Sequence, residues 1–340
     1  MKTPFGWPNR LVSPRKLSAA SNVAEDEAVL ADLDVAPVET PTGPSPTSRR
    51  FRLPGWPSFN RARVTASVEG TSLRVVSVID RRVAGWASIP LDSRLVKNGQ
   101  ISDPTDLGAV IGETFDRLEL SRRNVAWALP GFQASARILD VPILPGAELR
   151  RAITDEVEAS LGAAADDSYL SWQRLDGRIR RRGVFVLAVP RSTVLTALEA
   201  LEVAEIRPST MDLRPLALAR AIGRNDAVVA NLEDGNLDVA VVSKGVPTVL
   251  RSIPLPGQSA SLEPAQNRLV DEIDRALRYH DDANLDRPLD PETPVYLTGR
   301  LATGIALTEK IRALTGHPIG RLATGISYPV DFPVSEYLVN

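Results

Sequence analysis

Two segments in opposite halves of the chain follow nearly the same pattern: Ser67-Val-Glu-Gly-Thr-Ser-Leu-Arg-Val-Val-Ser-Val78 and Asn231-Leu-Glu-Asp-Gly-Asn-Leu-Asp-Val-Ala-Val-Val242. Each has a short apolar run, a turn with Glu and Gly, and then a run rich in Val and Leu. This pattern predicts a β-hairpin that feeds a sheet. A hairpin that occurs twice predicts two related half-domains that face each other.

The composition indicates a globular protein. The chain has 340 residues, 43% of them hydrophobic, and a mean hydropathy of -0.08. This length allows one two-lobed domain or two ordinary domains, plus a tail. The net charge of -2 gives no general electrostatic reason to bind nucleic acid, so we expect no nucleic-acid partner.

Cysteine usage and hydropathy further narrow the class of protein. The chain has no Cys, which excludes disulfides, thiol nucleophiles and thiolate metal sites. No run approaches the roughly 20 apolar residues of a membrane span, and the first residues lack the apolar stretch of a secretory signal. We therefore expect a cytoplasmic protein, with any membrane contact peripheral.

Residues 1–60 are rich in Pro, Ser, Thr and Ala and show little apolar periodicity. Such a segment buries too little surface to offset its ordering entropy, so we predict a disordered tail. Gly-Trp-Pro occurs twice in it, around Trp7 and Trp56. Trp is a common anchor in docking peptides, which suggests a docking motif, although chance repetition in a Pro-rich segment is the favoured interpretation.

The rest of the chain divides into three predicted units. Residues 61–131 have the order strand, strand, strand, helix, strand, which predicts the first half-domain. Residues 132–207 predict an α+β insert with a strand, a helix, two strands and a final helix. Residues 208–340 repeat the strand pairs and helices of the first half and predict the second half-domain.

Five stretches carry a resemblance to a known family, in the family's order. They are Leu95–Asp103, Val125–Pro130 with Ile138–Pro145, Glu148–Glu158, Ala188–Arg191 through Met211–Arg220, and Gly245–Ile253 with Leu269–Tyr279. With them, the chain from about Val64 to Pro333 resembles the PilM family of type IV pilus assembly proteins, relatives of the cell-division protein FtsA.

The resemblance implies a fold and a partner. The fold would be α/β, a two-lobed actin-like (ribonuclease H-like) duplication with an SHS2-like α+β insert in the first lobe. The partner would be the short cytoplasmic tail of an inner-membrane protein, PilN or a PilN-like protein, held in a groove between the insert and the first half-domain. Peptide capture of this kind needs no ATP.

The chain departs from the family where actin-like hairpins grip ATP and Mg²⁺. The family has Asp-Ile-Gly where this chain has Ser67-Val68-Glu69 and Asn231-Leu232-Glu233. A Glu at a turn that must approach phosphate brings both an obstruction and a like charge. The affected positions are Ser67, Glu69, Gly70, Thr71, Asn231, Glu233, Asp234, Gly235, and, at the adenosine-side turn, Gly299 and Arg300.

The second lobe also looks reduced. Few residues separate Leu255 from Glu263, where the family carries a helical subdomain over the nucleotide cleft. The leading hypothesis is therefore a pseudo-ATPase scaffold of the pilus or a related machine. It would have no catalytic residues, no cofactor and no metal.

Three alternatives remain open. An ATP-binding or ATP-hydrolysing switch could retain Mg-ATP if Ser67 and Asn231 hydrogen-bond a phosphate or a water. An FtsA-like membrane-associated filament would involve self-association. Glu69, Glu233 and Asp234 could instead form an acid pair or metal site, although their interpretation as ordinary hairpin-turn residues is favoured.

An Arg-rich run occupies the predicted turn between two strands of the insert. Its members are Arg178, Arg180, Arg181 and Arg182. A solvated turn is the favoured interpretation, because charge clusters at loop tips are common. The sharper hypothesis is contact with anionic lipid headgroups.

Overall fold

Two β-sheets, each built around one of the twin hairpins, organise the chain. The structure, a computed structural model, describes residues 63–337 except 98, 143, 162–164, 176–180, 234, 256–261, 286–287 and 324, and leaves the side chains of residues 146, 160, 161, 181 and 182 undescribed. The predicted disordered tail with Trp7 and Trp56 therefore lies outside the described residues, as do Asp234, Arg178 and Arg180.

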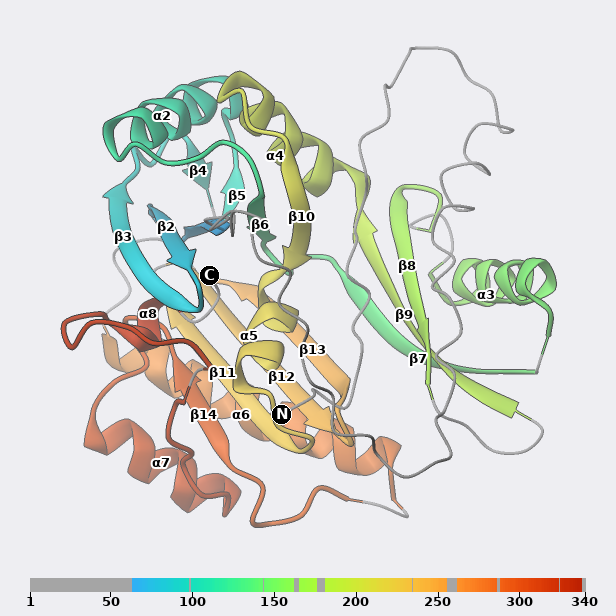
Figure 1. The fold of residues 1–340 in the computed structure, drawn as a ribbon. Helices are drawn as coiled ribbons and strands as arrows, with labels where there is room; N and C mark the ends of the chain where they lie inside the picture. The colour runs from blue at the N-terminus through green and yellow to red at the C-terminus, as the bar shows by residue number, and fades with distance from the viewer. Residues whose placement is uncertain are drawn as a thin grey trace, which may run out of the picture. The chain divides into compact units, whose positions relative to one another are not determined.

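The first sheet has the strand order β10-β6-β1-β2-β3 (Figure 1). Its strands are β1 (Arg63–Glu69), β2 (Ser72–Ile79), β3 (Arg82–Pro90), β6 (Val125–Leu129) and β10 (Pro208–Leu213). The first three are antiparallel neighbours, and β6 and β10 add in parallel. A short hairpin, β4 (Val96–Lys97) and β5 (Gln100–Ile101), precedes helix α2 (Pro104–Arg117). Asp103 caps α2 by accepting a hydrogen bond from the Asp106 N–H.

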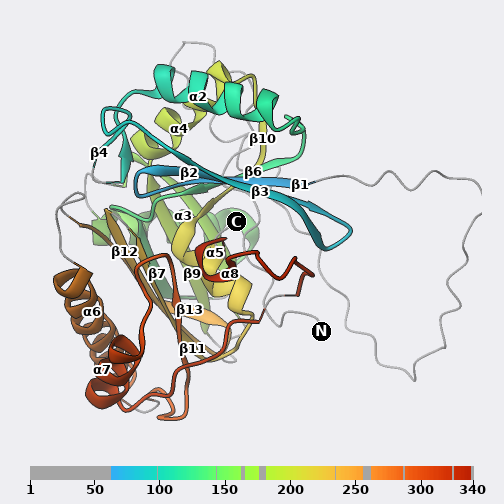
Figure 2. The same ribbon diagram turned by 90° about the vertical axis from the view of Figure 1, so that its left-hand side faces the viewer.

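The second sheet has the order β13-β12-β11-β14. Its strands are β11 (Ala227–Glu233), β12 (Asn236–Ser243), β13 (Val246–Pro254) and β14 (Val295–Thr298). Helices α6 (Leu262–Ala283) and α7 (Ile305–Thr315) cover one face, and α5 (Arg214–Ile222) packs on the other (Figure 2). A last short helix, α8 (Val334–Tyr337), follows.

Strand alternation decides which residues of the hairpins enter a core and which face the other sheet. Val64, Ala66 and Val68 of β1 point into the first core, under α2 and α4 (Arg191–Val203). Ala230 and Leu232 of β11 likewise point into the second core, under α6 and α7. The intervening residues of each hairpin therefore lie on the opposite face. We call the first sheet with its helices and the insert the first lobe, and the second sheet with its helices the second lobe.

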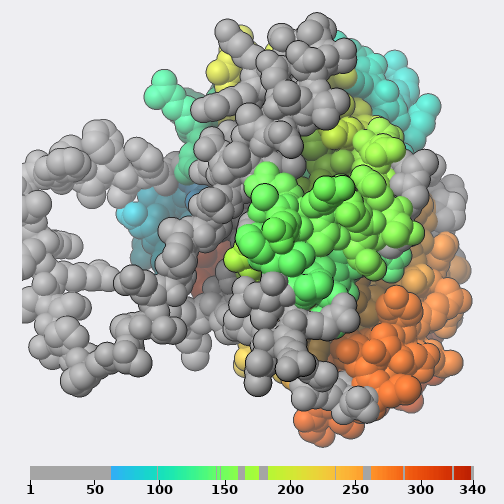
Figure 3. All heavy atoms as spheres, turned by 90° about the vertical axis from the view of Figure 1, so that its right-hand side faces the viewer, coloured from blue at the N-terminus to red at the C-terminus, as the bar shows by residue number. Residues whose placement is uncertain are grey.

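The insert forms a separate three-stranded sheet with the order β7-β9-β8. Its elements are β7 (Ser135–Pro142), α3 (Gly146–Leu161), β8 (Ser168–Arg174) and β9 (Arg181–Pro190). Helix α3 covers one face with Leu149, Ile153 and Val157, as their spacing of four predicts. The other face joins the first core through residues of β9. Figure 3 looks onto this insert, drawn in green, with the second lobe in orange below it.

Two predicted boundaries need correction. β10 (Pro208–Leu213) pairs with β6, so these residues belong to the first sheet although the sequence placed them in the second half-domain. Helix α4, assigned to the insert, buries Val194, Ala197 and Leu201 in the first core beside α2. The chain thus returns from the insert to complete the first lobe before it enters the second.

The Arg-rich run is also placed differently. Arg181 and Arg182 are strand residues of β9, opposite Pro142 and Val141 of β7, because β7 is long enough to extend the ladder to that point. They are therefore not part of the turn. The hypothesis of membrane contact stays a prediction.

Helix α2 meets α4 through a glycine, which gives a test of this packing. A Cβ at Gly108 would lie 2.5 Å from the Ala200 carbonyl oxygen and 2.5 Å from Val203 Cβ. We predict that Gly108→Ala lowers the free energy of unfolding by about 1–3 kcal/mol through overpacking. The matched control is Gly112→Ala on the same helix, whose Cβ would find its nearest neighbour 3.6 Å away. It should be neutral or stabilising by up to about 1 kcal/mol. Equal effects of the two substitutions in urea unfolding would contradict the described packing.

Candidate functional site

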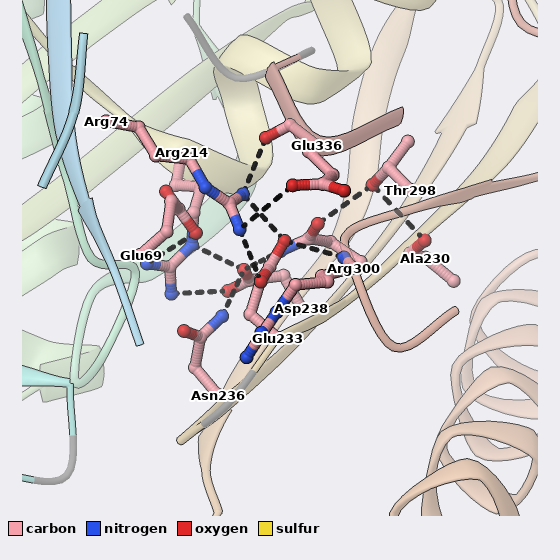
Figure 4. Close-up of polar contacts among 11 residues, drawn as sticks. Glu69, Arg74, Arg214, Ala230, Glu233, Asn236, Asp238, Thr298, Arg300 and Glu336 are labelled. Atoms are coloured by element: carbon pink, nitrogen blue, oxygen red, sulfur yellow. Dashed lines mark hydrogen bonds and ion pairs between the residues drawn. The ribbon is translucent and has the colours of Figure 1, made fainter. Parts of the chain in front are cut away.

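The polar inner faces of the two hairpins meet in one buried cluster. The two turns approach each other so closely that a Cβ at Gly235 would lie 3.8 Å from Gly70 Cα. Both glycines have positive φ, 89° at Gly235 and 58° at Gly70, which the tight turns require. We call the buried polar residues between the lobes the interlobe cluster (Figure 4). Its members, all at most 4% exposed, are Glu69, Arg74, Arg214, Asn231, Glu233, Asn236 and Asp238.

Arg74 and Glu233 form the central pair of this cluster. Arg74 extends from β2 of the first lobe, and Glu233 ends β11 of the second. The guanidinium donates Nη1–H to Glu233 Oε1 at 2.7 Å and Nη2–H to Oε2 at 2.8 Å. Burial alone would lower the pKa of Arg74, but the hydrogen bond and charge of Glu233, together with the charges of Glu69 and Glu336, outweigh it and raise that pKa. This bidentate pair joins two residues that are 159 positions apart in the chain.

Arg214 forms the second connection. It is the first residue of α5, directly after β10, and donates Nε–H to Asp238 Oδ2 at 2.5 Å. Its Nη1 lies 3.6 Å from Glu69 Oε2. Burial would lower the pKa of Arg214, but the charges of Asp238, Glu69 and Glu233, together with the hydrogen bond to Asp238, outweigh it and raise that pKa. Ser252 and Asn231 also donate to the Asp238 carboxylate, at 2.5 and 3.3 Å.

The two hairpins contribute equivalent positions with exchanged charges. In the first, Arg74 lies opposite Ser67 in the strand register, and in the second, Asp238 lies opposite Asn231. The arginine from one hairpin bonds the glutamate at the turn of the other. The aspartate bonds Arg214, which also faces Glu69 at the first turn. The two hairpins thus present complementary charges to each other between the two lobes.

The turn after β14 closes one side of the cluster. Thr298 donates its hydroxyl to Asn231 Oδ1 at 3.0 Å, and the Arg300 backbone N–H donates to Glu233 Oε1 at 2.8 Å. Gly299, at φ 91°, packs so tightly that a Cβ would lie 2.4 Å from the Leu232 carbonyl oxygen. The Gly299-Arg300 pair therefore contacts the second hairpin through its backbone.

The C-terminal segment closes the other side. Arg74 donates Nη1–H to the Glu336 carbonyl oxygen at 2.6 Å, and Gly299 N–H donates to the Ser335 carbonyl oxygen at 2.7 Å. The Tyr337 ring centroid lies 5.8 Å from the Arg74 guanidinium carbon. Upstream, the Val83 N–H donates to the Ser327 carbonyl oxygen at 2.8 Å, which attaches this segment to the edge of β3. Helix α8 therefore bonds to both lobes.

The structure brings most of the positions singled out from the sequence together. Around the contact between the two turns lie Glu69, Gly70, Asn231, Glu233, Gly235, Gly299 and the Arg300 backbone. Ser67 is buried on the same face of β1, and Thr71 lies beside the first turn. Interpreting Glu69 and Glu233 as ordinary turn residues is wrong. Both end strands and are buried, because each hairpin turn is covered by the other lobe.

Sequence reasoning missed Arg74, Arg214 and Asp238. A signal was present, since Arg74 and Asp238 interrupt apolar strands at the same position of the twin hairpins. Within the described ranges, no group of three His, Asp or Glu side chains is placed to share a metal ion. The carboxylates of the cluster face guanidinium groups instead.

Comparison with known proteins places this arrangement in a family. The family model for the type IV pilus assembly protein PilM matches residues 72–254. A chain of the solved PilM-PilN type IV pilus biogenesis complex is 19% identical, with a TM-score of 0.66 over 82% of this chain and 96% of that chain. No curated protein sequence matches.

Two further solved structures have lower scores. The cytoplasmic domain of EpsL, an inner-membrane component of the type II secretion system of Vibrio cholerae, is 11% identical, with a TM-score of 0.47 over 82% of this chain and 93% of that chain. The ethanolamine utilization protein EutJ from Carboxydothermus hydrogenoformans is 19% identical, with a TM-score of 0.45 over 86% and 92%.

The paired sheets, the twin hairpins and the α+β insert define a two-lobed actin-like protein, which confirms the expected fold class. The family match covers more than half of the chain. The chain belongs to the PilM family of type IV pilus assembly proteins. In the described part of the chain, no helix has the length and apolarity needed to cross a membrane.

The central ion pair can be tested by a substitution series. Arg74→Met leaves the Glu233 carboxylate buried without its main counter-charge, and we predict a loss of about 3–5 kcal/mol in the free energy of unfolding. Adding Glu233→Gln removes the buried charge and leaves an amide oxygen for the Arg300 N–H, so the double variant should recover most of the loss.

Urea unfolding of the three proteins checks this prediction. The control is Arg94→Met, which removes an arginine from the exposed Arg94–Asp92 pair and should leave stability nearly unchanged. A single Arg74→Met variant as stable as this control would show that the cluster does not hold the lobes.

Proposed function

We propose that this protein is a non-catalytic scaffold of type IV pilus assembly, located at the cytoplasmic face of the inner membrane. In this proposal it binds the cytoplasmic tail of a PilN-like membrane protein. Membership of the PilM family supports the role in pilus assembly, and the similarity to a chain of the solved PilM-PilN complex supports the class of partner. The observation that carries the non-catalytic part is the buried interlobe cluster.

A bound nucleotide with Mg²⁺ needs backbone N–H donors, cationic side chains and carboxylates reserved for the metal or water. At the twin turns, the two buried arginines are instead engaged by carboxylates of the chain itself. The Gly299 and Arg300 N–H groups donate to Ser335 and Glu233. Glu69 and Glu233 add negative charge beside the turns where phosphates would lie. These features support a cleft that is held by ion pairs and that needs no ATP.

The insert offers a surface for the partner's tail. On the face of its sheet away from α3, Ile138 of β7 lies opposite Phe185 of β9 in the register. Phe185 is fully buried in the first core, whereas Ile138 is 47% exposed. This face of the insert sheet is therefore buried against the first core at Phe185 and partly exposed to solvent at Ile138. We place the partner's tail along it, between the insert and the first half-domain.

A capture experiment tests this placement. The tagged protein is incubated with solubilised cell membranes, and bound proteins are identified by mass spectrometry. We predict that the wild-type chain retains a PilN-like membrane protein equally with and without Mg-ATP, and that Ile138→Asp reduces its recovery at least about tenfold, because a buried charge costs more than about 1.4 kcal/mol.

The matched control is Ile305→Asp, which places the same charge at an apolar side chain that is 77% exposed on the second lobe. It should leave the recovery unchanged. Deletion of residues 1–60 should also leave it unchanged, and a loss on that deletion would move the interaction to the Gly-Trp-Pro tail. Recovery that requires Mg-ATP would overturn the non-catalytic part of the proposal.

A further inference from the structure

Glu69 and Glu233 occupy equivalent positions in the twin hairpins but have different surroundings. Both Glu233 oxygens accept hydrogen bonds from Arg74, and Oε1 also accepts one from the Arg300 N–H. Neither Glu69 oxygen has a hydrogen-bond partner among the described residues, although both oxygens are buried. The nearest cationic atom is Arg214 Nη1 at 3.6 Å, and Arg214 is already engaged by Asp238.

The charges around Glu69 do not balance. The groups that face it are Arg214 from α5, Glu233 from β11, Arg74 from β2 and Asp238 from β12. With Glu69, the buried cluster thus holds three carboxylates and two guanidinium groups. Each guanidinium is hydrogen-bonded to one carboxylate, Glu233 or Asp238, and Arg74 also lies 4.0 Å from the partly exposed Glu336 carboxylate. One buried negative charge, on Glu69, is therefore left over.

We propose that the interlobe cluster binds one proton, on the Glu69 carboxyl, and that release of this proton weakens the closed arrangement of the two lobes. Protonation leaves two carboxylates to two guanidinium groups and supplies one O–H donor. Asn236 Oδ1, on the opposing turn, is another buried acceptor without a partner among the described residues. This proton site involves the interlobe cluster alone and does not depend on the membrane partner.

The acidity of Glu69 is consistent with this role. Burial, with a further contribution from Glu233, raises the pKa of Glu69 from 4.5 to about 7, although Arg214 and Arg74 oppose the rise. Between these two values the unfolded chain releases the proton while the folded chain keeps it. The folded state then binds more protons, so the free energy of unfolding falls as the pH rises from 4.5 to about 7. Above about pH 7 the folded chain has also released the proton, and the buried negative charge then lowers the free energy of unfolding by its full amount.

The substitution Glu69→Gln supplies a neutral side chain of the same shape and should remove this pH dependence. Linkage changes the unfolding constant by up to tenfold per pH unit, so the ratio of wild-type to variant unfolding constants should rise up to about 300-fold between about pH 4.5 and about pH 8. Urea unfolding of the full chain at a series of pH values measures this ratio. A ratio that stays constant with pH would overturn the proposal.

The equivalent substitution in the second hairpin is the matched control. Glu233→Gln removes a hydrogen-bonded carboxylate whose charge also helps to raise the pKa of Glu69, so it should destabilise the protein and move the Glu69 component of the pH profile to lower pH without removing it, because burial is the main cause of the raised pKa. A merely structural role of Glu69 would give the same pH-independent result for both substitutions.

Infrared difference spectroscopy provides a readout that does not depend on unfolding. A protonated carboxyl has a C=O stretch separate from the bands of carboxylates. Wild-type protein at about pH 6 should show this band, and it should disappear as the pH rises past the Glu69 pKa of about 7. The band should be missing from Glu69→Gln. Its absence from the wild-type chain at about pH 6 would contradict the proposal even if the variant failed to fold.

Discussion

The bidentate pair between Arg74 and Glu233 is the constraint on which the arrangement of the two lobes depends. Each side chain comes from a different sheet, and each is almost completely removed from water. A charge in that position is tolerated only while its partner is present, because the desolvation cost of one unpaired ion is several kcal/mol. The fold of each lobe can form around its own apolar core, but these two charges are satisfied only when the twin hairpins face each other. The pair therefore couples the folding of one lobe to its placement against the other.

The remaining contacts extend this constraint in two directions. On one side, Arg214 forms a second connection between the lobes, because it contacts Asp238 of the second lobe and also faces Glu69 of the first. On the other, α8 supplies carbonyl oxygens to Arg74 and to the Gly299 N–H. Buried ion pairs add little net stability compared with apolar packing, but a mispaired one is costly. The cluster thus selects one relative position of the lobes. The chain itself provides the charges on both sides of the contact between the twin hairpins.

Much of the fold could be predicted from the sequence, because it depends on local patterns. The alternation in Ser67–Val78 and Asn231–Val242 defined both hairpins, and the spacing of Leu149, Ile153 and Val157 defined the buried face of α3. The boundary at residue 208 could not be found in this way. It depends on the parallel pairing of β10 with β6, which lies far earlier in the chain and leaves no local signal.

The site was predicted only in outline. The unusual Glu69 and Glu233 were visible in the sequence, but their burial was not, since a Glu beside Gly in an isolated hairpin would face water. Arg74 and Asp238 would also face water in an isolated hairpin, so their roles were not predicted. Only the opposing sheet turns these positions into a buried cluster, and that arrangement is a property of the tertiary structure. The one sequence signal for this arrangement was that Arg74 and Asp238, which have opposite charges, occupy equivalent positions in the two hairpins.

We propose that the interlobe cluster, and not a nucleotide, sets the relative position of the lobes. The chain has no Cys, so spin labels can be attached to single cysteines introduced by Glu113→Cys on α2 and Glu309→Cys on α7, which are both exposed. Pulsed electron paramagnetic resonance then measures the distance between the lobes with and without saturating Mg-ATP. We predict one narrow distance distribution that Mg-ATP leaves unchanged. A distribution that shifts or narrows on addition of Mg-ATP would contradict the proposal.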